Sequence, residues 1–198
     1  MDLAKHVAAH FLDSAELKRR VALELSDVIV QAAEMMTQCF LNNGKLLVCG
    51  NGGSASDAMH MAGELVGRLE RERPGLPVIA LSADSSVMTA LGNDYDYEQV
   101  FSKQVTAFGN PGDVLLVLTT SGNSPNVLAA VAQAHERDMQ VIALSGKNGG
   151  ELAHVLKPND IEIRIPHNRT MRIQEAHITA IHALCDLVDI ALLGEPNA

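Results

Sequence analysis

The chain alternates between short apolar runs and longer stretches in which apolar residues recur at helical spacing. The stretches with helical spacing lie near residues 54–70, 97–108 and 125–137. Alternation of strands with helices is typical of a parallel sheet. Four of the five apolar runs are continuous, as in buried parallel strands, whereas the fifth alternates apolar and polar residues and is expected at a sheet edge. In chain order these runs are residues 46–49, 78–81, 114–118, 141–144 and 161–165.

Two longer helical patterns flank this region. Apolar residues recur at helical spacing from about residue 15 to 41, and Asn42-Asn43-Gly44 supplies residues that commonly end a helix. A final helix rich in Ala, Ile and Leu is expected at about 169–192. The apolar faces of both helices exceed what one sheet face requires, which predicts contacts between copies of the chain. We expect one domain over residues 1–198, with 1–43 as a helical extension that packs in the oligomer and 44–198 as sheet core and last helix.

Composition and charge narrow the class of protein. Hydrophobic residues make up 47% of the chain and charged residues 20%, as in a globular protein. The apolar runs are too short to span a bilayer, and the first residues lack the basic and apolar regions of a secretory signal. Cys39, Cys49 and Cys185 form no C-x-x-C motif, which fits a reduced chain. A net charge of −9 argues against direct nucleic-acid binding, so we expect a cytoplasmic protein without membrane or nucleic-acid partners.

A glycine-rich loop, Cys49-Gly-Asn-Gly-Gly-Ser-Ala55, follows the first apolar run. It is not a Walker A loop, because no Lys-Ser/Thr pair follows the glycines. Its glycine spacing satisfies the relaxed dinucleotide fingerprint, but Asp84, the nearest candidate for the acidic residue expected about 20 residues further on, comes later. A tight turn with Ser54 as helix N-cap is the structural alternative. The side-chain donors of Asn51 and Ser54 favour a loop that binds a ligand.

A second loop, Leu118-Thr-Thr-Ser-Gly-Asn-Ser-Pro125, follows the third apolar run. It gathers hydroxyl groups around a glycine, and its proline suits the first position of a helix. Ser124 is expected to cap that helix whatever else it does. Ligands of open α/β sheets bind at the carboxyl ends of strands, and a helix N-terminus favours anions. The two loops therefore predict a site for a small phosphorylated molecule, with Thr119, Thr120, Ser121 and Ser124 around the phosphate.

Two pairs of polar residues on helical stretches add candidate acid–base chemistry. His60 and Glu64 are four residues apart on the helix after the first loop, so both side chains can face one cleft. Gln174 and His182 lie about two turns apart on the last helix. Taken singly, each histidine is most simply a core or surface residue, and Glu64 is a solvated carboxylate. Together with the phosphate loops, the set suits the interconversion of a ketose phosphate and an aldose phosphate, which needs a base and an acid.

Five motifs stand in order along the chain. They are Cys-Gly-Asn-Gly-Gly-Ser from Cys49, Asp57-Ala-Met-His60-Met-Ala-Gly-Glu64-Leu-Val-Gly-Arg68, Gly92-Asn93-Asp94, Thr120-Ser-Gly-Asn-Ser124 and Arg172-Ile-Gln174-Glu-Ala-His-Ile-Thr-Ala-Ile-His182. Jointly they resemble the phosphoheptose isomerases, the sedoheptulose-7-phosphate isomerase branch of the sugar-isomerase (SIS) domain family, over nearly the whole chain. Thr119 stands where the family usually has serine, and Gly63 stands where it often has glutamate. The first departure keeps a hydroxyl, and the second leaves Glu64 intact.

The resemblance implies both a fold and an activity. The fold is α/β, a three-layer sandwich with a five-stranded parallel flavodoxin-like sheet, an SIS domain with added N- and C-terminal helices, and the assembly is a homotetramer. The activity is that of an aldose–ketose isomerase. It converts sedoheptulose 7-phosphate to D-glycero-D-manno-heptose 7-phosphate through an enediol intermediate, the first step of ADP-heptose and lipopolysaccharide core synthesis.

The resemblance also implies roles for individual residues. Glu64 is the general base and His182 its acid partner. His60, Glu64, Gln174 and His182 can hold a zinc ion in each subunit, because imidazole, carboxylate and amide groups suit a borderline divalent cation. A Glu64 that binds metal is a weaker base, so its two roles compete. The implied substrate contacts are Asn51, Gly52, Gly53, Ser54, Glu64, Asn93, Asp94, Thr119, Thr120, Ser121, Ser124 and Gln174. Arg68 matches a motif but receives no role.

Two other classes of protein are alternatives. The initiator-associating protein of the same family is a tetramer that binds the replication initiator, and it resembles this chain through much of the sheet. It typically lacks the carboxylate at the position of Glu64 and the second histidine of the last helix, and the presence of both here favours the enzyme. A sugar-phosphate-sensing regulator is expected to carry a DNA-binding domain, for which 198 residues leave no room.

Overall fold

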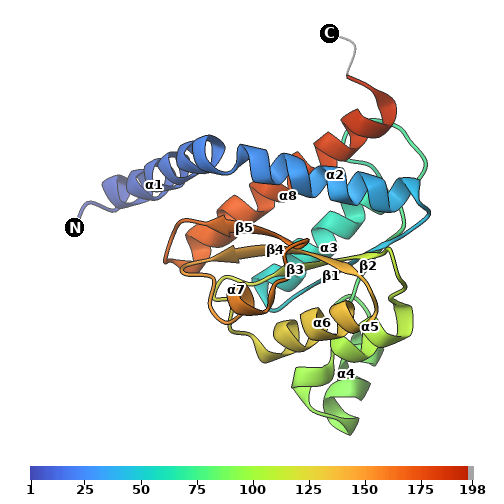
Figure 1. The fold of residues 1–198 in the computed structure, drawn as a ribbon. Coiled ribbons are helices and arrows are strands. Elements are labelled where there is room, and N and C mark those ends of the chain that lie inside the picture. The colour runs from blue at the N-terminus through green and yellow to red at the C-terminus, as the bar shows by residue number, and fades with distance from the viewer. Residues whose placement is uncertain (196–198) are drawn as a thin grey trace.

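A five-stranded, all-parallel sheet forms the centre of the chain in the computed structural model, which describes residues 1–195 (Figure 1). The strands are β1 Leu46–Gly50, β2 Val78–Ala80, β3 Val114–Leu118, β4 Gln140–Gly146 and β5 Ile161–Ile165. Their order across the sheet is β2-β1-β3-β4-β5, so all five predicted strands and the edge position of β5 are confirmed. The three-residue strand β2 forms the other edge, where Val78 and Ala80 are nevertheless buried, in agreement with its continuous apolar run.

The order of strands reverses beside β1. Leu46 of β1 is in register with Val78 of β2 on one side and with Val114 of β3 on the other. The chain therefore adds β2 and then β3 to opposite sides of the same strand. Loops that leave the carboxyl ends of β1 and β3 diverge at such a switch point, and open α/β sheets bind their ligands there. The two polar loops singled out in the sequence both begin at this place.

Helices cover both faces of the sheet, which confirms the predicted three-layer sandwich (Figure 1). Successive strand residues point to opposite faces, so Leu47 and Val48 belong to different apolar clusters. Burying both faces explains why the interior strands are continuously apolar. One face is covered by α2 Ser26–Leu41, α3 Gly53–Val66 and α8 Thr170–Leu193, and the other by α5 Ser102–Phe108 and α6 Pro125–Glu136.

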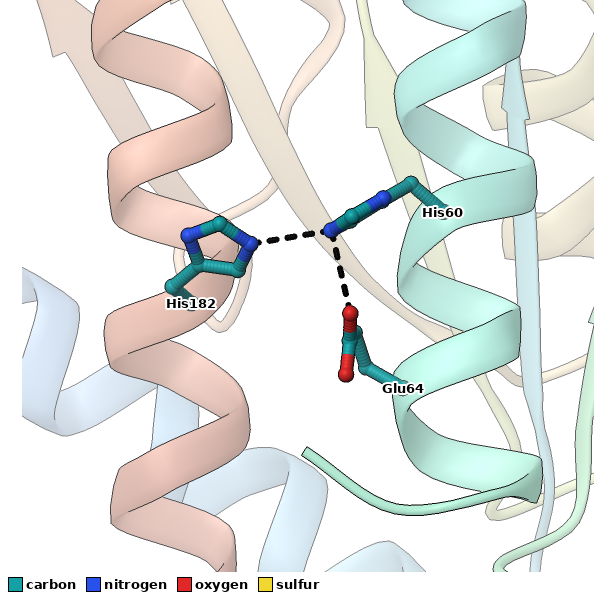
Figure 2. A group of neighbouring side chains, drawn as sticks. All are labelled: His60, Glu64 and His182. Carbon is teal, nitrogen blue, oxygen red and sulfur yellow. Dashed lines mark hydrogen bonds and ion pairs between the residues drawn. The ribbon is translucent and has the colours of Figure 1, made fainter. Parts of the chain in front are cut away.

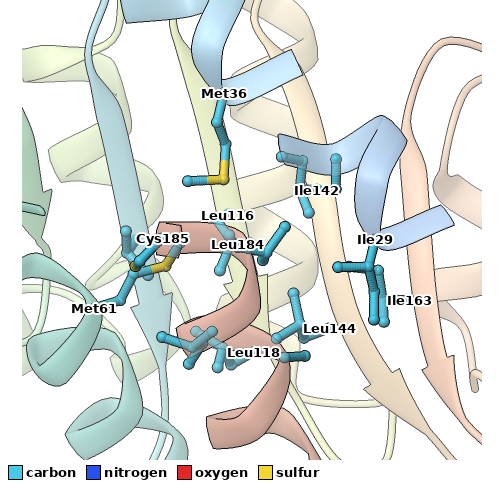
Figure 3. Close-up of a cluster of buried hydrophobic side chains, with 14 of the residues drawn as sticks. Ile29, Met36, Met61, Leu116, Leu118, Ile142, Leu144, Ile163, Leu184 and Cys185 are labelled. Carbon is cyan, nitrogen blue, oxygen red and sulfur yellow. The ribbon is translucent and has the colours of Figure 1, made fainter. Parts of the chain in front are cut away.

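The apolar cluster under α3 and α8 fixes how these two helices sit on the sheet. Figure 3 shows Met61 of α3 and Leu184 of α8 converging on Leu116 and Leu118 of β3. All four side chains are completely buried. Burying a large apolar side chain contributes about 1.5–3 kcal/mol. This cluster therefore holds the helices that carry the polar residues of interest in a defined place.

The N-terminal region differs from the single long helix predicted. It forms α1, Leu3–Glu24, and then α2, because Leu25 leaves the helical region with φ −123° and ψ 0°. The hydroxyl of Ser26 donates to the carbonyl of Ala22 at 2.6 Å, a back-bond that bends helices. The helix also begins earlier than predicted, since the carboxylate of Asp2 accepts two N–H groups of the first turn. As a result α1 projects beyond the sheet (Figure 1).

The segment after β2 contains a helix that the apolar pattern does not predict. This helix, α4, spans Ser85–Asp94, and its side chains are half-buried or exposed, so it has no strong apolar stripe. The carboxylate of Asp84 caps α4 by accepting two backbone N–H groups, which accounts for Asp84 without a dinucleotide. The predicted helix over 97–108 is divided into a 3₁₀ turn, η1 Tyr97–Gln99, and α5. A short helix, α7 Leu152–Val155, was also not predicted.

α8 is the one helix within residues 1–195 that is long and apolar enough to cross a membrane, with a mean hydropathy of 1.6 over an 18-residue window. In this fold it packs against the sheet, α2 and α3 instead. Ile173, Ile181 and Val188 of α8 are completely buried in the same apolar cluster as strand residues. Its apolar composition is thus explained by a core position.

Candidate active site

The first glycine loop turns tightly from β1 into α3. Gly52 has φ +57°, a left-handed conformation that favours glycine, and it is the N-cap of α3. The alternative that Ser54 caps this helix is wrong, because Ser54 lies inside the first turn and is buried. A Cβ atom on Gly53 would come within 2.6 Å of Nε2 of Gln174. The absence of a side chain at Gly53 thus lets the loop contact α8.

The side chain of Asn51 joins the first loop to the second. Its Nδ2 donates to Oδ1 of Asn126 at 2.8 Å, and Nδ2 of Asn126 donates back to Oδ1 of Asn51 at 2.9 Å. The hydroxyl of Tyr97 also donates to Oδ1 of Asn51, at 3.3 Å. Sequence reasoning missed Asn126 and Tyr97, and their separations of 75 and 46 residues from Asn51 leave no local signal. The paired amides hold the start of α6 beside the first loop.

The second loop is folded around its own hydroxyl groups. Thr119 is buried, and its Oγ1 accepts the N–H of Gly122 at 3.2 Å. Oγ of Ser121 accepts the N–H of Asn123 at 3.2 Å. Gly122 has φ +69°, and a Cβ atom there would lie 1.8 Å from the carbonyl oxygen of Gly149. Both the conformation and the close approach of backbone therefore require glycine at this point.

Ser124 and Thr120 supply two further hydroxyl groups of the second loop. Ser124 is the N-cap residue of α6, as predicted, with Pro125 at the first helical position. Its side chain makes no capping hydrogen bond within the described chain, which leaves the hydroxyl for a ligand. Oγ1 of Thr120 lies 3.5 Å from Oγ1 of Thr170, the first residue of α8. The loop therefore places hydroxyls and the N-terminus of α6 together, an arrangement that suits an anion.

A hollow of about 680 Å³ adjoins the first loop. Asn93, near the end of α4, lines it together with Asn51 and Gly52. The carboxylate of Asp94 accepts a hydrogen bond from the side-chain amide of Asn93 at 2.8 Å. Asp94 itself does not line the hollow. The structure thus brings Asn93 to the first loop, whereas the hydroxyls of the second loop lie outside this hollow.

The candidate acid–base residues meet where α3 and α8 lie side by side, a partly exposed place that is called the groove from here on. Nε2 of His60 lies 2.9 Å from Nε2 of His182 and 3.2 Å from Oε1 of Glu64 (Figure 2). The side chain of Glu64 is 20% exposed and that of His60 is 42% exposed, so the groove opens to solvent. His60 and His182 are 122 residues apart in the chain. The fold therefore assembles the cluster that the sequence could only suggest.

The cluster of His60, Glu64 and His182 suits a divalent metal ion. Each residue offers one ligand atom, and the three atoms lie within 4.8 Å of one another. Zinc binds imidazole nitrogen and carboxylate oxygen at about 2.0–2.2 Å in a tetrahedral arrangement, so two of its ligand atoms lie roughly 3.5 Å apart. The donor set and spacing fit zinc. Gln174, predicted as a further ligand, lies against Gly53, and its metal role stays a prediction.

Asp57 is a polar residue of α3 to which sequence reasoning gave no role. It lies three residues before His60, and its Oδ2 atom is buried without a hydrogen-bond partner among the described residues. Burial raises the pKa of this carboxyl, while the nearby imidazole of His60 acts in the opposite direction. The face of α3 toward the groove thus carries a second carboxyl group, and the motif Asp57-Ala-Met-His60 was the only signal for it.

Comparisons with known proteins agree with this fold. The model of the SIS domain family matches residues 10–146. The phosphoheptose isomerase of Methylibium petroleiphilum is 58% identical to this chain over 195 residues, which cover 98% of each chain. The phosphoheptose isomerase of Laribacter hongkongensis is 57% identical over 194 residues, which cover 98% of this chain and 99% of the relative. The solved structure of phosphoheptose isomerase from Neisseria gonorrhoeae has a TM-score of 0.90 and 53% identity, covering 94% of this chain and 98% of that one.

A second solved structure, a phosphoheptose isomerase from Francisella tularensis, has a TM-score of 0.93 at 46% identity and covers 96% of this chain and 99% of its own. The parallel sheet with helices on both faces, together with the family match, defines the class: an α/β domain of the SIS type. Within that class, the chain belongs to the SIS domain family and, inside it, to the phosphoheptose isomerases. The similarity extends over almost the full length of the relatives, so it includes the loops and the groove.

Proposed function

We propose that this chain is an aldose–ketose isomerase that converts sedoheptulose 7-phosphate to D-glycero-D-manno-heptose 7-phosphate through an enediol. The observation that carries the proposal is the meeting of Glu64 with His60 and His182 between α3 and α8. The two loops predicted to bind the phosphate lead into α3 and α6. A phosphosugar isomerase needs a carboxylate or imidazole base near the carbonyl carbon and donors for a distant phosphate. Membership of the phosphoheptose isomerases selects the seven-carbon sugar.

The residues divide the reaction between them. The substrate's phosphate is bound by the hydroxyls and N–H groups of the second loop, and the sugar by Asn51, Asn93 and Gln174. Glu64 takes a proton from C1 of the ketose and returns it to C2. His182 moves a proton from O1 to O2, so that the hydroxyl group at C1 becomes a carbonyl and the carbonyl group at C2 becomes a hydroxyl. Each transfer conserves the proton, and the net result is an isomer of the same composition.

Zinc binding is the second part of the proposal, with one ion in each subunit. His60, Glu64, Gln174 and His182 hold it, and when bound it polarises the sugar oxygens. His60→Ala should lower the zinc content measured by elemental analysis, because it removes a donor from the centre of the cluster. His154→Ala, which changes an exposed imidazole on α7, is the control. Full activity of a zinc-free preparation would reduce the ion to an incidental ligand.

The chain is proposed to act as a cytoplasmic homotetramer built from one domain, with residues 1–43 in the subunit contacts. Apolar side chains on α1 support this, since Leu3, Phe11 and Leu12 are largely exposed in the single chain. Exposed apolar surface of this kind commonly marks a protein interface. Analytical ultracentrifugation at micromolar concentration should give a tetramer, and a monomer would contradict the proposal.

The test of the isomerase itself is an assay of the purified protein with sedoheptulose 7-phosphate in deuterated water. We expect formation of the aldose phosphate together with exchange of the carbon-bound proton for deuterium. A chain that binds the sugar phosphate but shows neither exchange nor isomerisation would support the alternative, a non-catalytic protein that binds the replication initiator. That alternative is not favoured, because Glu64 and His182 are both present and lie in one groove.

A further inference from the structure

We propose that Arg73 and Asp189 form a buried clamp that fixes the register of α3 against α8 and so positions Glu64 relative to His182. Arg73 lies in the segment that follows α3, and Asp189 lies near the end of α8. Nε of Arg73 donates to Oδ1 of Asp189 at 2.5 Å, and the two side chains are only 1% and 2% exposed. The clamp is thus an ion pair inside the contact between the two helices that bear the groove.

The guanidinium of Arg73 also caps the end of α3 at the residue that carries the proposed base. Its Nη2 donates to the carbonyl of Glu64 at 2.9 Å, and its Nη1 donates to the carbonyls of Leu65 at 2.7 Å and Gly67 at 3.2 Å. The last carbonyls of a helix have no partner inside it and carry partial negative charge. A cation with a fixed fork of donors satisfies them, and it fixes the backbone of Glu64 itself.

Asp189 carries this constraint into the helix of the proposed acid. It follows His182 by seven residues, which is about two helical turns, so both lie on the same side of α8. Cys185 lies between them and is buried. Burial, with the carboxylates of Glu64 and Asp189 nearby, raises the pKa of Cys185 to about 12. The guanidinium of Arg73 therefore bonds to the backbone of Glu64, the proposed base on α3. It also bonds to the side chain of Asp189, which lies on the same side of α8 as His182, the proposed acid.

Stability alone is a weak reason for such a pair. A buried ion pair loses the hydration of both charges, and apolar residues of similar volume often stabilise a fold equally well or better. A pair of this kind is better suited to selecting one arrangement of two helices over its neighbours. Reacting groups demand such selection, because a displacement of about 1 Å can cost about a hundredfold in rate.

The same segment offers a matched control in Arg71. Its guanidinium donates to the carbonyls of Gly194 at 2.6 Å and Leu193 at 3.4 Å, at the end of α8, and these contacts are exposed. Arg71 therefore bonds to α8 without bonding to α3. Val188, which is completely buried on α8, supplies a second control for loss of stability without loss of the clamp.

The inference rests on the proposed isomerase activity and is tested with the full-length protein. Arg73→Lys keeps the positive charge but removes the several N–H donors of the planar guanidinium. The double variant Arg73→Met/Asp189→Leu replaces the ion pair by apolar side chains. We expect both to fold, with kcat for sedoheptulose 7-phosphate lower by about 10- to 100-fold and KM within about twofold of wild type. Arg71→Lys, and Val188→Ala assayed below its unfolding temperature, should keep wild-type kcat.

Crystal structures of the wild type and of Arg73→Lys provide a readout that does not depend on activity. We expect the separation of Glu64 and His182 to change by about 1 Å in the variant. Full kcat in the double variant, or an unchanged separation in Arg73→Lys, overturns the clamp. Failure of both clamp variants to fold overturns it as well, since the pair then holds the fold and not the register. A wild type without turnover refutes the proposed function instead, and the crystal structures still decide the clamp.

Discussion

The phosphate loops and the groove between α3 and α8 are built by different means, although they adjoin each other. In the second loop, residues close in the chain bond to one another, as Thr119 does to Gly122 and Ser121 to Asn123. In the groove, His60 and His182 come from helices that meet only in the folded chain (Figure 2). Local hydrogen bonds hold the shape of the second loop, whereas the groove depends on the packing of two helices. Binding and chemistry should therefore respond to different substitutions.

The largest expected effect comes from breaking the groove while leaving the loops intact. Glu64→Gln keeps the size of the side chain but removes the basic carboxylate, so turnover should fall by about 10²–10⁴-fold. Sugar-phosphate binding, measured by calorimetry, should remain within a small factor of wild type. Glu136→Gln changes an exposed carboxylate at the end of α6 and should have no effect. Loss of binding in Glu64→Gln would show that the two regions are not separable.

A second substitution tests whether Glu64 and His182 act together in the reaction. His182→Asn should also depress turnover. When it is combined with Glu64→Gln, the loss should be smaller than the product of the two separate losses, because an acid and a base that serve the same transition state are not independent. Strictly multiplicative losses in steady-state assays would argue against this pairing.

The opposite substitution weakens the loops and spares the groove. Replacing Ser121 and Ser124 by alanine removes two hydroxyls that face the predicted phosphate, and each bond to a charged group contributes about 1.5–3 kcal/mol. KM should therefore rise about 10- to 100-fold for each hydroxyl, with a smaller change in kcat. Thr106→Ala is the control, since among residues 1–195 that hydroxyl bonds only to the carbonyl of Ser102 within α5. An unchanged KM in the double variant would refute the phosphate assignment.

The smallest expected effect is on the free energy of unfolding, through a hydrogen bond that attaches α8 to the sheet. It is absent at neutral pH and emerges only in acid. His177 is buried, its Nε2 donates to the carbonyl of Ser145 at 2.9 Å, and burial lowers its pKa to about 4. The unfolded chain binds a proton near pH 6.5 that the folded chain binds only near pH 4. Stability should therefore be unaffected above pH 6.5 and should fall by about 3 kcal/mol as the pH decreases through this range.

Urea unfolding of the wild type and of His177→Gln between pH 4 and 8 measures this contribution. Glutamine can donate to the carbonyl of Ser145 but does not titrate, so the variant should lose that part of the pH dependence. Asp57 has a raised pKa and acts in the opposite sense, but it is present in both proteins and cancels in the difference. Parallel stability curves for the two proteins would contradict the assignment.

The sequence was sufficient for the elements and for the loops because their signals are local. Continuous apolar runs predicted the strands, and the alternation in Ile161–Ile165 predicted an edge. The glycines of the two loops, the hydroxyl cluster and Pro125 predicted ligand loops that enter helices. Where the local signal was weak, the prediction failed. The exposed helix α4 and the break at Leu25 depend on capping and back-bonding by single side chains, which an apolar pattern does not register.

What only the tertiary structure decided is which distant residues meet. Asn51 pairs with Asn126, His60 meets His182, and Arg73 reaches Asp189, each across at least 75 residues of chain. No periodicity encodes these contacts, because each depends on where a helix settles on the sheet, and that position is set by the joint packing of many apolar side chains (Figure 3). The sequence determined the chemistry that each region can offer, and packing in three dimensions determined which groups can act together.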